Sequence, residues 1–307
     1  MAMNNLTQRI LTAAIAGGIV VAGIIFSPWG AYIFCLVVAV LGLLEFFRLT
    51  GVSGRLQPTL MLIFAIGTFI EPLLLYVTPI LIPVFGVISL FKKKIDNPVN
   101  YLTRLIFAYF YSFLPFLLLT IMTGAHGIGF DIGFAEKLYL MDHVSSVSGT
   151  PSVMADFAFE KLSFSLTAPK YHSRIILGIL FMIWTVDSMA YFTGRAFGKN
   201  KLFPRHSPKK SWEGAIGGGL SCIGLSVVFH YVWPMLDTHM NWIVIGCLLA
   251  VSVQFGDLVE SMFKRSLQIK DSGGLLPGHG GILDRFDGFY VAIPVLFMYW
   301  CIVEYVI

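Results

Sequence analysis

Residues 241–263 read NWIVIGCLLAVSVQFGDLVESMF, and this stretch decides the fold. It is long enough for one transmembrane helix, which needs about 20 mainly apolar residues, yet Asp257 and Glu260 lie within it. Over the whole chain 57% of residues are hydrophobic and only 12% are charged, where about 25% charged residues is usual. So few polar side chains cannot cover a water-soluble surface, and the sequence therefore predicts an all-α polytopic integral membrane protein.

The apolar runs predict about nine transmembrane helices. A ninth, shorter run at 77–91 contains two prolines and could be a re-entrant segment instead. The eight longer runs lie at 9–26, 30–48, 57–75, 101–122, 173–194, 213–233, 241–263 and 286–306.

The basic residues predict the orientation. With nine helices, nearly all Lys and Arg residues lie on one side of the membrane, including Lys92–Lys94 and the basic residues of 195–210. Because basic loops tend to stay in the cytoplasm, we expect the N-terminus inside and the C-terminus outside. Without a span at 77–91, the Lys92–Lys94 cluster would lie outside.

The chain divides into three predicted regions. Residues 1–122 hold about five N-terminal spans, 123–172 form an external loop, and 173–307 hold four spans with cytoplasmic active-site loops. In the external loop, Phe134–Met141 and Val153–Leu166 alternate apolar and polar positions, which fits either short interfacial helices or a loosely ordered loop.

The first cytoplasmic loop follows the span at 173–194. Asp187 lies inside this apolar segment, where a bare carboxylate is costly and a functional role is the first hypothesis; a structural ion pair with Arg195 is the alternative. The run from Ser207 to Ser211 precedes a predicted helix N-terminus, which suits a polyphosphate, although a basic loop could also set topology or touch anionic lipid. The candidate binding residues here are Asp187, Arg195, Ser207, Lys209, Lys210, Ser211 and Glu213.

The second loop begins on the helix of 241–263. Asp257, Glu260, Ser261 and Lys264 fall on one helical stripe, which must face a polar cavity rather than lipid. The glycines of 273–281 would let backbone amides approach an anion or would simply form a flexible turn. The candidate catalytic residues are Asp257, Lys264, Arg265, Lys270, Asp271, His279, Asp284, Arg285 and Asp287.

These residue types share one chemistry. Carboxylates beside Lys and Arg at a membrane surface are suited to Mg²⁺-assisted phosphoryl or nucleotidyl transfer, because Mg²⁺ prefers carboxylate, water and phosphate oxygens, and basic groups neutralise the charge that develops on leaving phosphates. The sequence therefore predicts a phosphate-handling enzyme that acts on a lipid.

At these residues the sequence closely resembles the phosphatidate cytidylyltransferases, the CDP-diacylglycerol synthases. Ser261–Asp287 meets in full the family signature of Ser-x-x-Lys-Arg, Lys-Asp and Pro-x-His-Gly-Gly-x-x-Asp-Arg-x-Asp, and Asp187–Gly214 is similar to a second family block. The resemblance covers about 174–307. It implies that CTP and phosphatidate give CDP-diacylglycerol and pyrophosphate, with the lipid phosphate attacking the α-phosphorus of CTP.

The resemblance also implies roles for individual residues. Asp257 and Asp284, with Asp287 close by, would form a metal site for Mg²⁺, to which a second cation could be added. Lys264, Arg265 and Lys270 would bind phosphate, and Ser207, Lys209 and Lys210 would meet the triphosphate. His279 would donate to a phosphate oxygen or order its loop.

The expected partners are CTP, phosphatidate and the lipid bilayer, with a homodimer suggested by the resemblance and no nucleic acid. We expect a bacterial inner membrane location with the active site facing the cytoplasm. Alternatives are a CTP-dependent polyprenol kinase, an ether-lipid (archaeol-type) cytidylyltransferase and, from another class, a secondary transporter of an anionic substrate, which should show paired broken helices near the midplane.

Overall fold

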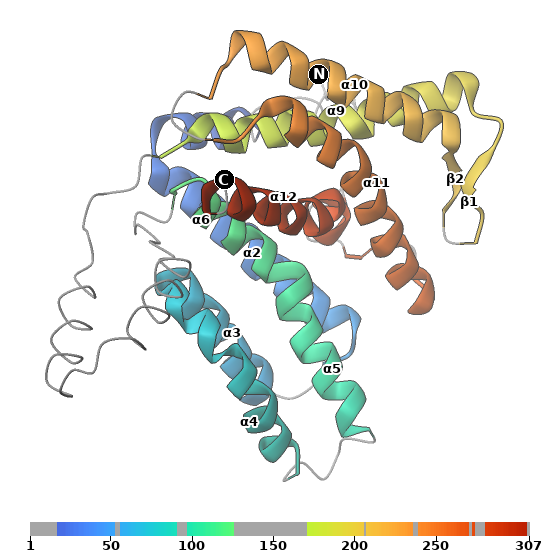
Figure 1. Cartoon of the computed structure of the whole chain (residues 1–307). Coiled ribbons are helices and arrows are strands. Elements are labelled where there is room, and N and C mark those ends of the chain that lie inside the picture. The colour runs from blue at the N-terminus through green and yellow to red at the C-terminus, as the bar shows by residue number, and fades with distance from the viewer. Residues whose placement is uncertain are drawn as a thin grey trace, which may run out of the picture.

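The N-terminal half is organised around one apolar helix, α2 (Pro28–Leu49), in the computed structural model of the chain (Figure 1). Ser27 caps this helix by accepting from the backbone N–H of Trp29 at 3.2 Å, and Pro28 occupies its first turn, as favoured at helix N-termini. The structure describes residues 17–52, 56–90, 97–125, 171–205, 207–235, 239–269, 272–273 and 280–305.

Within the N-terminal half, α3 (Leu56–Ile70), α5 (Pro98–Ala108) and α6 (Leu114–Met122) pack against α2, whereas α4 (Thr78–Leu90) packs against α5. A π-helical turn joins α5 to α6, so that Val99–Met122 runs as one long apolar helix. Aromatic rings fill the space between these helices, for example Phe69 against Phe113 with ring centroids 5.2 Å apart. The elements are α3 (Leu56–Ile70), η1 (Pro72–Val77), α4 (Thr78–Leu90), α5 (Pro98–Ala108), η2 (Tyr109–Phe113) and α6 (Leu114–Met122).

The C-terminal half consists of four long helices and one hairpin. Helix α10 packs against α9 and α11, and α11 packs against α12, which in turn contacts α6 of the first half. Gly218 allows the close approach of α10 to α9, because a Cβ there would lie 2.6 Å from the Val186 carbonyl oxygen. The elements are α9 (Ser173–Phe197), β1 (Lys201–Phe203), β2 (Ser207–Ser211), α10 (Trp212–Val232), α11 (Trp242–Ser266), η3 (Leu283–Arg285) and α12 (Asp287–Tyr305).

The predicted helical fold class is confirmed, and several of the helices are able to span a membrane. Among the described residues, six helices are long and apolar enough to cross a membrane, and shorter apolar helices occur at Gly17–Phe26, Leu56–Ile70 and Leu74–Phe85. The count of nine spans and their orientation stay predictions. The six long helices are Pro28–Leu49, Val99–Met122, Ser173–Phe197, Trp212–Val232, Trp242–Ser266 and Asp287–Glu304.

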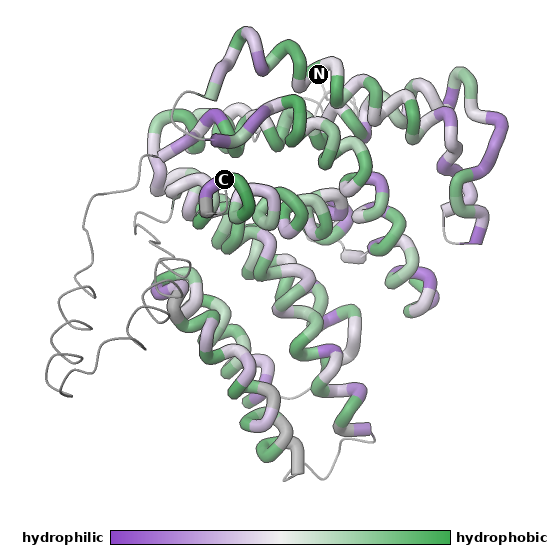
Figure 2. The backbone as a smooth tube through the Cα atoms, viewed as in Figure 1, coloured by the Kyte–Doolittle hydropathy of each residue, from purple (hydrophilic) through white to green (hydrophobic). Residues whose placement is uncertain are grey.

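The structure describes the loop after α9 in detail, whereas it describes only the two ends of the loop 123–172. The basic loop after α9, for which the sequence predicted no strands, contains the antiparallel hairpin β1–β2, in which Lys201 faces Ser211. The hairpin extends beyond the ends of α9 and α10, and hydrophilic residues gather there (Figures 1 and 2). The interfacial helices predicted in the external loop lie outside the described residues, but the ends of that loop meet where His172 N–H donates to the Thr123 carbonyl at 2.9 Å.

Candidate active site

Three carboxyl groups from two helices meet in an acidic cluster, Asp257, Glu260 and Asp287. One oxygen from each lies within 4.8 Å of the others. Close packing of α11 on α12 brings them together, because Gly256 has no side chain and its missing Cβ would lie 2.6 Å from the Asp287 carbonyl oxygen. Hard oxygen ligands at this separation are of the kind that divalent cations such as Mg²⁺ prefer.

The hairpin supplies a positive charge to this cluster. Lys210 of β2 forms an ion pair with Asp257, joining Nζ to Oδ2. Asp187 of α9 interacts electrostatically with Asp257 and with Lys210. The basic segment after α9 and the polar stripe of α11 therefore meet at one site, with Asp187 beside it.

Lys264 supplies a second positive charge, which contacts a different member of the cluster, Glu260. Lys264 Nζ lies 2.8 Å from Glu260 Oε2 and donates to Asp284 Oδ1 at 2.7 Å. The other oxygen of Asp284 accepts from the backbone N–H groups of Ser272 at 2.9 Å and Gly281 at 3.2 Å. Burial alone would raise the pKa of Asp284, but these hydrogen bonds outweigh burial and lower the pKa to about 2.

The predicted metal ligands are only partly brought together. Asp257 and Asp287 lie in the acidic cluster, whereas Asp284 is engaged by Lys264 and by the two backbone amides, so its role as a metal ligand stays a prediction. Glu260 completes the cluster, although it was not among the predicted ligands. Its position three residues after Asp257 on one helical stripe was the signal that could have identified it.

Several predicted binding residues of the first loop have structural partners. Ser211 caps α10 by accepting from Gly214 N–H at 3.2 Å, and Glu213 accepts from the backbone N–H groups of Lys199 and Asn200, each at 3.1 Å. Arg195 donates to the Tyr191 hydroxyl at 3.3 Å; among the described residues no ion pair joins it to Asp187. These contacts stabilise the hairpin and its flanking helices.

The remaining predicted residues are spread around the site. Ser207 and Lys209 lie on β2, where Lys209 is exposed. Arg265 is exposed and donates to the Ile269 carbonyl at 3.3 Å, and Arg285 is exposed on η3. Three of the predicted residues lie outside the described part of the chain: Lys270, Asp271 and His279.

One functional candidate that sequence reasoning missed is Glu45 of α2. Its carboxyl group accepts from the Ser272 hydroxyl and, at 2.7 Å, from Ile282 N–H. The signal available in the sequence was a carboxylate inside the apolar run 30–48, which is costly unless it is partnered.

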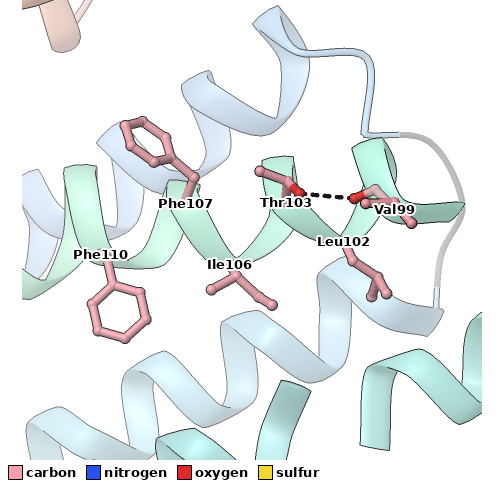
Figure 3. Close-up of a pocket in the computed structure, with 6 residues that line it drawn as sticks. All are labelled: Val99, Leu102, Thr103, Ile106, Phe107 and Phe110. Atoms are coloured by element: carbon pink, nitrogen blue, oxygen red, sulfur yellow. Dashed lines mark hydrogen bonds between the residues drawn. The ribbon is translucent and has the colours of Figure 1, made fainter. Parts of the chain in front are cut away.

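An amphipathic cavity of about 410 Å³ lies beside Lys264 and Glu260, between α2, α5 and α11. Its wall is mainly apolar and includes four aromatic rings, and Arg104, which donates to the Thr50 carbonyl at 2.7 Å, adds a positive charge. An apolar groove of about 430 Å³ follows α5 next to it and shares Thr103 and Phe107 with the cavity (Figure 3). The groove is lined by Val99, Leu102, Thr103, Ile106, Phe107 and Phe110.

Comparison with known proteins shows which family this chain is similar to. The sequence model of the cytidylyltransferase family matches residues 7–303. Proteins named phosphatidate cytidylyltransferase are similar to parts of the chain: that of Haemophilus influenzae is 46% identical over 133 residues, covering 42% of this chain and 46% of its own length. That of Bacillus subtilis is 47% identical over 116 residues, which cover 38% of this chain and 43% of the relative. That of Pseudomonas aeruginosa is 48% identical over 122 residues, which cover 39% of this chain and 45% of the relative. The chain thus spans about half the length of these curated relatives in each alignment. With a family match over nearly its whole length, the chain belongs to the cytidylyltransferase family.

Proposed function

We propose that this protein transfers the cytidylyl group of CTP to phosphatidate, giving CDP-diacylglycerol and pyrophosphate. The observation that carries the proposal is the convergence of the acidic cluster with Lys210 and Lys264 at the ends of apolar helices, in a chain of the cytidylyltransferase family. The relatives named phosphatidate cytidylyltransferase support phosphatidate as the acceptor.

The proposed reaction needs positioning and charge compensation more than covalent help from the protein. A phosphate oxygen of the lipid forms the new bond to the α-phosphorus of CTP, and the bond from that phosphorus to pyrophosphate breaks. Because the nucleophile is already an anionic phosphate, no protein nucleophile is required. The chain's task is to hold the two phosphates in line and to offset their repulsion.

The acidic cluster fits a Mg²⁺ ion. Carboxyl groups outnumber ammonium groups in the site, and the hard oxygens of Asp257, Glu260 and Asp287 match the ligand preference of this ion. When bound, Mg²⁺ would offset the negative charge of the phosphates. Asp284, and any second cation, belong to the proposal as further members of the centre, and Asp187 lies close enough to bias the charge of the site.

The basic groups would bind the phosphates. Lys210 is held by Asp257 with a side chain 22% exposed, so its ammonium group can contact a bound triphosphate while it stays near the cluster. Lys264 would contact a phosphate from the opposite side, where it already bridges Glu260 and Asp284. Ser207, Lys209, Arg265, Lys270 and His279 are proposed as further phosphate contacts.

The cavity beside Lys264 supports a lipid acceptor. Its lining includes Arg104 and Lys264, whose positive charges suit an anionic headgroup. The apolar groove along α5 continues from Thr103 and Phe107 and suits an acyl chain. A substrate that joins a phosphate to a hydrocarbon chain matches a basic cavity that adjoins an apolar groove.

The proposed topology places nine spans in the inner membrane of a bacterium, with the site facing the cytoplasm; a homodimer is likewise a proposal. Reporter fusions after Lys94 and Lys210 should report the cytoplasm, and a fusion after Ile307 should report the opposite side, because the basic loops define the inner face. A cytoplasmic C-terminus would contradict the nine-helix arrangement.

The function is tested by incubating the purified protein with CTP, Mg²⁺ and phosphatidate. We expect CDP-diacylglycerol and pyrophosphate in equal amounts, and no product with a polyprenol as acceptor. Parallel reactions with an ether-lipid phosphate test whether the enzyme prefers ester-linked or ether-linked lipids. If CTP stays intact while an anionic substrate crosses the membrane of vesicles that contain the protein, the protein is a transporter instead.

A further inference from the structure

Glu45 joins α2 of the N-terminal half to both ends of the glycine-rich run 273–281. The residue is 5% exposed and lies near the C-terminal end of α2. One carboxyl oxygen, Oε1, accepts from the Ser272 hydroxyl, and the other, Oε2, accepts from Ile282 N–H at 2.7 Å. These two partners flank the glycine-rich run 273–281, so one carboxyl group binds both ends of the same loop.

The ends of this loop are shaped to fit that carboxyl group. A Cβ at Gly281 would collide with Glu45 Oε1 and with the Ser272 hydroxyl oxygen, and a Cβ at Gly273 would lie 3.1 Å from Glu45 Oε1. The glycine at position 281 therefore permits a close approach that any larger residue would prevent. The contact depends on the tertiary fold, since it pairs α2 with residues more than two hundred positions later.

Asp284 binds the same two ends from the other side. Its Oδ2 accepts from Ser272 N–H at 2.9 Å and from Gly281 N–H at 3.2 Å, and its Oδ1 accepts from Lys264. Lys264 in turn contacts Glu260 of the acidic cluster. A continuous chain of polar contacts thus runs from Glu45 through the loop ends, Asp284 and Lys264 to the cluster.

We propose that Glu45 is a positioning residue for the cytidylyl transfer reaction. By fixing the separation of the loop ends, it sets where Asp284 lies and hence where Lys264 presents its ammonium group. Glu45 acts through these residues and does not itself touch the substrate. The expected effect on catalysis rests on the proposed function. The binding of the two loop ends by Glu45 can be measured separately, without an activity assay.

Placing a carboxyl group in an apolar helix is costly unless its oxygens are partnered, and here both oxygens are used by one loop. If the role were only to stabilise helix packing, partners on neighbouring helices would serve equally well. Instead the partners are the two loop ends that Asp284 also holds, which links Glu45 to the geometry of the site.

The test compares Glu45→Ala with Glu45→Gln and with Thr68→Val in the full chain. Glu45→Ala removes both acceptors and should lower kcat/KM by about ten- to a hundredfold, since small misplacements of reacting groups have effects of this size. Glu45→Gln keeps an oxygen for Ile282 N–H and offers an N–H group to the Ser272 hydroxyl, so it should restore most of the activity. Thr68 is fully buried in α3, away from the loop, and Thr68→Val should leave kcat/KM per folded molecule unchanged.

Hydrogen exchange supplies the readout that does not depend on activity. In Glu45→Ala the amides of Ser272, Gly281 and Ile282 should exchange faster than in the wild type, while Thr68→Val should leave them unaffected. Ser272→Ala, which removes only the hydroxyl, should give an intermediate change and keeps the test decisive if Glu45→Ala does not fold.

Unchanged exchange at these amides, or a Glu45→Gln variant as inactive as Glu45→Ala, would overturn the proposal. Activity per folded molecule equal to the wild type in Glu45→Ala would also overturn it. Failure of the wild type to make CDP-diacylglycerol would instead refute the proposed function, while the exchange data would still decide whether Glu45 clamps the loop.

Discussion

The two halves of the described structure use buried polar groups in different ways. In α2 to α6 most hydroxyls are satisfied locally: Ser112, Thr120 and Thr123 each donate to a carbonyl three or four residues earlier. In α9 to α12, charged groups from different elements meet, as Lys210 does with Asp257. Local pairing keeps a polar residue compatible with an apolar helix, whereas convergent pairing assembles a site. Glu45 is a polar residue of the first half that follows the second pattern.

The largest effect is expected at the carboxyl groups of the site, Asp257 of the acidic cluster and Asp284 beside Lys264. Asp257→Asn and, as a separate variant, Asp284→Asn should each lower kcat by at least about a hundredfold, a loss of roughly 2.7 kcal/mol of transition-state stabilisation, because each substitution removes a charge and keeps the size. Thr120→Val, which removes a locally satisfied hydroxyl, should leave kcat unchanged. Steady-state kinetics at saturating Mg²⁺ measure these effects.

Near-wild-type activity of either Asn variant at saturating Mg²⁺ would contradict the proposed role of that residue in the metal centre. It would leave Asp187, Asp271 and Asp287 as the carboxylates to test next. A large loss of kcat in Thr120→Val would contradict the distinction between the two halves.

An intermediate effect is expected at the hairpin. Lys210→Ala should raise the KM for CTP by about ten- to a hundredfold, since losing one charge-assisted hydrogen bond costs roughly 1.5–3 kcal/mol. Lys209→Ala should have a smaller effect, because Lys209 is exposed whereas Lys210 contacts the cluster through Asp257. A change confined to the KM for phosphatidate would show that the hairpin binds the lipid phosphate or the membrane.

The smallest effect concerns stability against acid. The pKa of Asp284 is lowered from its ordinary 3.8 to about 2, so the ionised carboxylate stabilises the folded state above about pH 4. This contribution, at most about 2 kcal/mol, is lost as the pH falls through 2. Thermal unfolding of the detergent-solubilised protein between pH 6 and pH 2 should show this loss in the wild type and a weaker dependence in Asp284→Asn. Equal pH dependence of the two proteins would contradict the pairing with Lys264.

Much of the fold could be predicted because its signal is local. The apolar runs at 30–48, 101–122 and 241–263 correspond to helices, since about 20 consecutive apolar residues leave few other structures. The polar stripe on α11 was also predictable from helical spacing, and Ser261 donates to Asp257 there at 3.3 Å. The hairpin was not predicted, because its short strands depend on the register between Lys201 and Ser211 rather than on a repeating pattern.

The site was harder to predict because its contacts join distant positions. The family resemblance predicted that Asp284 and Asp257 share a metal site. In the structure Glu260 lies with Asp257 and Asp287, whereas Asp284 forms an ion pair with Lys264. No spacing rule relates Glu45 to Ser272, which lies 227 positions later. Such pairs become visible only when the helices are placed together.

The central claim is that the α-phosphorus of CTP is the centre attacked. Purified protein should be given phosphatidate and CTP labelled either at the α- or at the γ-phosphorus, with Asp257→Asn as the control. The account predicts that the α-label appears in the lipid product and the γ-label in pyrophosphate, and that the control transfers neither. A γ-label in the lipid with the α-label in CDP would show a kinase, and no label in the lipid would contradict the account altogether.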